Sequence, residues 1–134
     1  MIRLFRNIPK VLTVRNTPKR NFSTTHIMKK MVYTDNEEWH YHENDIIKVG
    51  ITKNAIEQLG DIVYLDFNFE NNDNIDSGDE LLSIESVKAT EGINIDFNCI
   101  LIENNENLAE DLDIINENPE NVETSYLVKI KKID

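Results

Sequence analysis

The chain has 134 residues, of which 40% are hydrophobic, and a formal net charge of −11. This length fits one domain with a hydrophobic core of its own, and no apolar run approaches the length of a membrane span. The acidic balance argues against nucleic acids and anionic membranes as partners. The single cysteine, Cys99, excludes an internal disulfide and suits a reducing compartment.

The charges are divided unevenly along the chain. Residues 1–30 hold eight of the 14 lysines and arginines and no acidic residue, while residues 31–134 hold six basic and all 25 acidic residues, a net charge of −19. Such an acidic body suits partners with basic docking surfaces, but solubility alone explains it equally well.

Residues 1–22 are predicted to be a mitochondrial transit peptide, and residues 23–134 the folded domain. The segment is basic and free of acid, and its apolar residues are scattered among the charges rather than gathered in the core of a secretory signal. The sequence Arg20-Asn21-Phe22-Ser23 resembles a processing site, which places the cut near Ser23 and the mature protein in the mitochondrial matrix. The alternative is a disordered basic tail that stays attached.

Alternating apolar residues predict strands at 32–33, 39–42 and 46–51, with Trp39 in the core. His40 and His42 fall on one face of a strand, a spacing that can hold a metal ion. With no cysteine and no third histidine nearby, a structural role for both is favoured, and no metal site is predicted.

A short helix is predicted over residues 53–59. Thr52 can cap its first turn and Gly60 can end it, and Ala55, Ile56 and Leu59 form its apolar stripe. The β-branched and aromatic run 62–67 predicts a central strand.

The polar run 71–78 is predicted to be a solvated loop. Its acidic residues suggest calcium, but Ile75 occupies a ligand position of the calcium-loop pattern, so that pattern fails.

Two alternating segments, 80–84 and 93–97, predict a hairpin with Lys88 exposed at its tip. Lys88 is the only basic residue between Gln58 and Ser125. A primary amine on a flexible stem is suited to carrying an acyl group. The alternative is an ordinary surface lysine.

The C-terminal third is predicted to contain a second hairpin, a helix and a strand. The hairpin joins 93–97 to 100–103 through Asn98, which can adopt positive φ, and Cys99, a turn or packing residue whose pKa acidic neighbours should raise. The helix spans 108–115 and the final strand 126–131.

Residues Glu85-Ser86-Val87-Lys88-Ala89 resemble the signature around the lipoyl-lysine of the H protein of the glycine cleavage system. The resemblance covers roughly residues 33–131 and includes four further blocks in register: Glu37 to Trp39, Val49 to Val63, Gly78 to Glu80, and Asn105 to Leu108 with Leu127 to Ile130.

The resemblance implies a mostly β fold, a lipoyl/biotinyl-type flattened barrel made of a sandwich of two antiparallel sheets with short added helices. It implies lipoate covalently bound to Lys88, with Glu85, Ser86, Val87 and Ala89 as the attachment motif. The lipoyl arm would take the aminomethyl group of glycine from glycine decarboxylase (P protein) to the aminomethyltransferase (T protein). Dihydrolipoyl dehydrogenase (L protein) would reoxidise it, and a separate enzyme would attach the lipoate.

No catalytic residue is predicted, because no Ser-His-Asp set, Cys-His pair or glycine-rich phosphate loop occurs. The expected protein is thus a non-catalytic carrier. Glu85 has two interpretations: recognition by the attaching enzyme, or an ordinary solvated carboxylate.

The chain departs from the family pattern in two loops. Asp96 and Cys99 replace a proline and a glycine, and Ser125-Tyr126 replaces Gly-Trp. Three rivals to the carrier of the glycine cleavage system stay open, and only the last of them rests on these loop differences. They are a biotin carrier, whose lysine usually lies between methionines; a donor that relays lipoate to other complexes; and a non-carrying paralogue.

Overall fold

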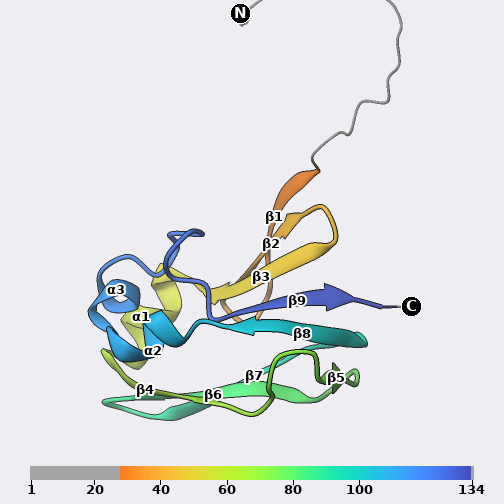
Figure 1. Cartoon of the computed structure of the whole chain (residues 1–134). Helices are drawn as coiled ribbons and strands as arrows, with labels where there is room; N and C mark the ends of the chain where they lie inside the picture. Colours follow the sequence, from red (N-terminus) through yellow and green to blue (C-terminus); the bar gives the residue numbers. More distant parts are fainter. Residues whose placement is uncertain (1–27, 134) are drawn as a thin grey trace, which may run out of the picture.

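The computed structural model describes residues 28–133 (Figure 1). The predicted transit peptide, residues 1–22, and the cut near Ser23 lie outside the described residues. The fold is mostly β, with two antiparallel sheets and three short helices, which confirms the predicted sandwich, although the sheets do not close into a barrel. Within residues 28–133 no helix has the length and apolar character that crossing a membrane requires.

The larger sheet has six strands in the order β1-β2-β3-β9-β8-β5, and the smaller has three in the order β4-β6-β7. The strands of the larger sheet are β1 (Lys29–Tyr33), β2 (Glu38–Glu43), β3 (Ile46–Ile51), β9 (Val128–Lys132), β8 (Cys99–Asn104) and β5 (Asn74–Ile75). Those of the smaller sheet are β4 (Ile62–Phe67), β6 (Glu80–Ser86) and β7 (Thr90–Asn94). The helices are α1 (Lys53–Leu59), α2 (Glu106–Glu110) and α3 (Asp113–Glu117), which gather at one end of the sheets (Figure 1).

The core lies between the two sheets and is made mainly of isoleucine, leucine and valine. The larger sheet contributes Val49, Leu101 and Ile130, and the smaller contributes Leu82 and Ile84, all exposed by 1% or less. Burial of these branched side chains is the main term that holds the sheets face to face.

Trp39 is fully buried, as predicted, and its position depends on Gly50. The two residues are partners across β2 and β3, and a Cβ atom on Gly50 would lie 2.2 Å from the indole ring. The indole Nε1–H donates to the carbonyl of Pro119 at 3.0 Å. The tryptophan therefore connects the larger sheet to the loop over residues 119–126, which contains the altered pair Ser125-Tyr126 and whose Ser125 is also buried.

The predicted helix over 53–59 is confirmed, including both caps. The Thr52 hydroxyl accepts from the Ala55 N–H at 3.1 Å, and Gly60 has φ +79°. Ala55 is buried, and Ile56 and Leu59 pack against the core.

The prediction of a second hairpin is wrong. Strand β7 pairs with β6, whereas β8 pairs with β9 and β5 in the other sheet, so residues 95–98 cross between the sheets. Alternation marks both strands but cannot tell which neighbour each one pairs with.

Asn98 does not adopt the predicted positive φ, since Glu37, Asn44 and Asn72 are the non-glycine residues of the described chain that do. It stabilises the crossover through its side chain instead, because its Oδ1 accepts from the Ser77 N–H at 2.8 Å.

The predicted solvated loop at 71–78 is only partly correct. Ile75, in β5, is 1% exposed and pairs with Cys99 in β8, so the loop contributes to the core. The isoleucine that breaks the calcium pattern is thus a core residue.

The single helix predicted over 108–115 is two helices, α2 and α3, because Asp111 leaves helical conformation with φ −137°. Asn105 caps α2, with its Oδ1 accepting from the Leu108 N–H at 3.2 Å. The final strand begins at Val128, two residues later than predicted.

Cys99 is fully buried, which confirms its packing role. Burial, with a smaller contribution from Asp79, raises the pKa of its thiol to about 11. Since the thiolate is the reactive form, the folded protein is expected to resist a thiol reagent at pH 8 and to react fully once unfolded in urea. Rapid, stoichiometric labelling of the folded protein would contradict this burial.

Candidate functional site: the lysine turn and the adjoining pocket

Lys88 lies where the sequence predicts it, exposed in the turn between β6 and β7. The turn has Val87 and Lys88 at its centre, with the Ser86 N–H donating to the Ala89 carbonyl at 2.8 Å. The Lys88 ammonium takes part in none of the ion pairs found within residues 28–133. The amine is therefore open to solvent and to a modifying enzyme.

Ser86 holds the turn together, a role that the sequence did not reveal. Its hydroxyl accepts from the N–H groups of Lys88 and Ala89, at 3.2 and 3.0 Å, and donates to the Ala89 carbonyl. A short serine side chain can replace the backbone partners that a tight turn lacks. The turn contains neither glycine nor asparagine, the residues that tight turns usually use. The three hydrogen bonds of the Ser86 hydroxyl stabilise it instead.

The base of the turn is tied to the start of β4. The Val87 N–H donates to the Asp61 carbonyl at 3.0 Å. The next residue, Ile62, is clamped by the Asn116 side chain, which accepts from its N–H at 2.8 Å and donates to its carbonyl at 3.1 Å. The backbone around Lys88 is thus fixed while its side chain stays free.

Glu85 is exposed and pairs with Tyr64 on β4 and Thr90 on β7. Recognition of this carboxylate by the attaching enzyme stays a prediction. Among the described residues no group of three or more histidine, cysteine, aspartate or glutamate side chains could hold a metal ion. His40 instead faces Glu38, with Nε2 and Oε1 3.5 Å apart.

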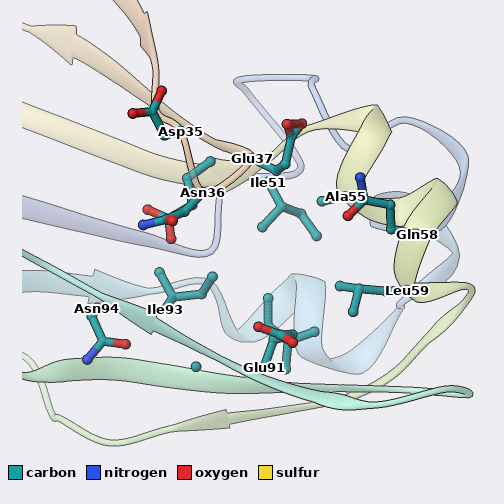
Figure 2. Close-up of a pocket in the computed structure, with 13 residues that line it drawn as sticks. Asp35, Asn36, Glu37, Ile51, Ala55, Gln58, Leu59, Glu91, Ile93 and Asn94 are labelled. Atoms are coloured by element: carbon teal, nitrogen blue, oxygen red, sulfur yellow. The ribbon is translucent and has the colours of Figure 1, made fainter.

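Beside the turn lies a pocket of about 450 Å³ that the sequence did not predict. Figure 2 shows it between β7 on one side and α1 with the β2–β3 layer on the other. Its apolar wall includes Ile51, Leu59 and Ile93, and its acidic residues are Asp35, Glu37, Glu38 and Glu91. Among residues 28–133 no lysine or arginine lines it, so the pocket favours a ligand with an apolar body and a positive charge.

Glu38 is the most buried of these acids, with 5% of its surface exposed. Its Oε1 lies 3.5 Å from Nε2 of His40, an imidazole that is charged only when protonated. The Glu37 carboxylate, by contrast, already accepts from the Thr52 hydroxyl and from Asn54. Glu38 is therefore the acid best placed to meet a cation in the pocket.

The lysine stem begins beside this pocket. The Cγ and Cε atoms of Lys88 lie 3.8 Å from the point where a Cβ atom on Gly60 would stand. Leu59, the residue before Gly60 in the chain, lines the pocket. A group attached to Lys88 can therefore extend into solvent or fold back toward the pocket.

Gly60 is needed here for two reasons. Its φ of +79° with ψ of −170° is a conformation restricted almost entirely to glycine, and a Cβ would lie 2.7 Å from Cγ2 of Val87. Gly60→Ala is expected to lower the free energy of unfolding by about 1–3 kcal/mol and to displace Val87 and Lys88.

Gly78→Ala is the matched control, because Gly78 also has positive φ, +97°, but open space around its missing Cβ. Urea unfolding measures the stability of both variants, and backbone amide NMR shifts report the turn. Only Gly60→Ala should move the amide signals of residues 86–89. Identical shifts at the turn in both variants would show that Gly60 does not position it.

The fold and site together define a class: a small β sandwich that presents one lysine on a rigid turn. Comparison with known proteins specifies the family. The family model described as glycine cleavage H-protein matches residues 31–134. The chain belongs to this family.

Curated relatives agree with this assignment. The chain is 41% identical over 101 residues to the probable glycine cleavage system H protein of Picrophilus torridus, covering 75% of this chain and 78% of the relative. It is 39% identical over 107 residues to the glycine cleavage system H protein of Dinoroseobacter shibae, covering 80% and 85%.

A solved structure supports the fold. The crystal structure of a glycine cleavage system H protein from Mycobacterium marinum superposes with a TM-score of 0.68, covering 76% of this chain and 83% of that chain. Sequence identity in that alignment is 24%, so the likeness concerns the fold.

Proposed function

We propose that this chain is a non-catalytic carrier of the glycine cleavage system, with lipoate bound through an amide to Nζ of Lys88. The observation that carries the proposal is the turn itself, an exposed lysine with no ion-pair partner among residues 28–133, on a backbone fixed by Ser86 and Asp61. When bound, the dithiolane of lipoate supplies the redox and group-transfer chemistry that the chain lacks.

The attached arm would carry the aminomethyl group of glycine from glycine decarboxylase to the aminomethyltransferase. Dihydrolipoyl dehydrogenase would restore the oxidised dithiolane. Family membership and the fixed, accessible turn support this role. The relay of lipoate to other complexes uses the same lysine and is the second candidate, and a non-carrying paralogue would leave Lys88 bare.

The pocket supports the carrier role further, because it can shelter the loaded arm. The aminomethyl group carries a protonated amine, and the pocket combines an apolar wall with the buried carboxylate of Glu38. A cation that meets this acid away from bulk water is held more strongly than it would be at the surface. The chain would thereby protect the loaded group between enzymes.

Residues 1–22 would direct the protein to the mitochondrial matrix. The absence of acidic residues there supports this, as does the family match, which begins only at residue 31. A tagged protein without residues 1–22 is expected to remain in the cytosol. Its import into mitochondria would show that the targeting signal lies elsewhere in the chain.

The decisive assay for the carrier role is glycine–bicarbonate exchange by glycine decarboxylase, with the lipoylated full chain as acceptor and free lipoate as control. We expect the lipoylated protein to support exchange at concentrations well below the concentration of free lipoate that gives the same rate. Exchange no better than with free lipoate would eliminate this function and leave lipoate relay.

Glu38→Gln tests the pocket in the same system. The variant keeps the shape of the side chain but removes its charge, so the half-life of the aminomethyl-loaded protein should fall by about tenfold. Asp35→Gln is a control that removes an acid from an exposed part of the pocket. An unchanged half-life in Glu38→Gln would show that the loaded arm does not use this acid.

A further inference from the structure

Three exposed apolar side chains gather at the end of the smaller sheet that presents Lys88. Val63, Tyr64 and Val87 are 51%, 53% and 66% exposed. The other large hydrophobic residues exposed within 28–133 are Met28 and Tyr33, in or next to β1 of the other sheet. We call Val63, Tyr64 and Val87 the bulge patch.

An irregularity in strand β4 creates this patch. Ile62 pairs with Ser86 and Tyr64 with Glu85, so Val63 is an extra residue opposite β6. Two consecutive side chains, Val63 and Tyr64, consequently face solvent, where regular alternation would turn one of them inward. A β-bulge re-aims side chains in this way, and the bulge lies directly opposite the base of the lysine turn.

Apart from Lys88 itself, the exposed charged residues beside the patch are acidic. Asp61, Asp66 and Glu85 are exposed beside or within the same strands, and Lys88 is the only basic residue between Gln58 and Ser125. A complementary partner would therefore offer an apolar socket with a basic rim.

We propose that the bulge patch is the docking surface for the enzyme that acylates Lys88, an inference that rests on the proposed carrier function. This enzyme must reach the amine before any arm exists, so it must contact the turn itself. Enzymes that act on the dithiolane meet the far end of the arm instead. Three side chains also fall far short of the roughly 800 Å² per partner of a stable complex, which suits a brief enzyme–substrate encounter rather than a second copy of this chain.

The chemical step requires lipoate activated as an acyl adenylate. The unprotonated Nζ attacks the acyl carbon, the C–N bond forms, the C–O bond to the phosphate breaks, and AMP leaves. The nitrogen releases one proton, so the products are an amide, AMP and H⁺.

The test is a steady-state acylation assay with full-length protein, lipoate, ATP and a lipoate ligase. The variant Val63→Thr/Tyr64→Thr/Val87→Thr removes the apolar surface while keeping β-branched residues that suit strands. We expect kcat/KM for acylation to fall by about tenfold, mainly through KM. Tyr33→Thr, which removes a tyrosine 59% exposed on β1, is the matched control and should stay within about twofold.

Each outcome decides a different question. Acylation of the triple variant with the wild-type kcat/KM overturns the docking surface but leaves the carrier function standing. No acylation of the wild type overturns both proposals. A wild-type dimer in sedimentation that the triple variant abolishes overturns the proposal in favour of self-association. If the triple variant loses its circular dichroism spectrum, Tyr64→Thr and Val87→Thr decide singly, each with an expected loss of about threefold.

Discussion

Lys88→Arg is expected to abolish lipoylation completely while leaving the fold unchanged. The guanidinium keeps the positive charge but stays protonated, so it cannot attack an acyl carbon. Because Lys88 is exposed and takes part in none of the ion pairs of residues 28–133, the free energy of unfolding should change by less than about 0.5 kcal/mol. Acylation by a lipoate ligase and urea unfolding measure the two effects.

Lys53→Arg is the matched control, since Lys53 is also exposed but lies at the start of α1. It should be lipoylated at the wild-type rate. A lipoyl signal that persists in purified Lys88→Arg would place the modification on another lysine. Loss of the signal in both variants would point to a general defect in the substrate.

Trp39→Ala is expected to cause the largest loss of stability, about 3–5 kcal/mol, because it empties a fully buried volume. It also leaves the Pro119 carbonyl without the indole donor that lies 3.0 Å away. Urea unfolding at neutral pH measures this loss. A cost near 1 kcal/mol would mean that the core readily closes around the missing ring.

Gly50→Ala provides a control, because its effect on stability should change sign when Trp39 is removed. In the wild type, Gly50→Ala forces a Cβ to within 2.2 Å of the indole and should cost about 1–3 kcal/mol. In the Trp39→Ala background that ring is gone, so the same change should be neutral or stabilising, as alanine usually is in a strand. Equal costs in both backgrounds would contradict the direct contact.

The strands and the lysine turn could be predicted from the sequence because their signals are local. Alternation marks strands such as β2, β3 and β6, and Thr52 and Gly60 mark the limits of α1 through the hydroxyl cap and the positive φ of glycine. The exposure of Lys88 followed from the polar break between two alternating segments. These features depend on neighbours a few residues away.

The pairing of β8 could not be predicted in this way. Residues 93–103 look like a hairpin, yet β7 and β8 belong to different sheets, because β8 pairs with β9 and β5 in the larger sheet while β7 pairs with β6 in the smaller. The same limit explains Ile75, whose burial depends on Cys99 in a distant strand. Non-local contacts of this kind leave no mark on short-range alternation.

The pocket and the bulge patch could not be predicted from the sequence either. The pocket joins Glu38 from β2 to Glu91 from β7, and no spacing rule links residues so far apart. The bulge at Val63 has one sequence signal, the uninterrupted apolar run 62–65, but a fully buried strand has the same pattern. The exposure of Val63 and Tyr64 in the structure distinguishes the bulged strand from a fully buried one.

Lipoylation of Lys88 can be read directly from the intact mass of the protein purified from its own cells. We predict a mass that exceeds that of the processed chain by one amide-linked lipoyl group, with the peptide containing Lys88 carrying the whole increase. A biotinyl increase at Lys88, or an unmodified Lys88 in cells that lipoylate their other carriers, would contradict it.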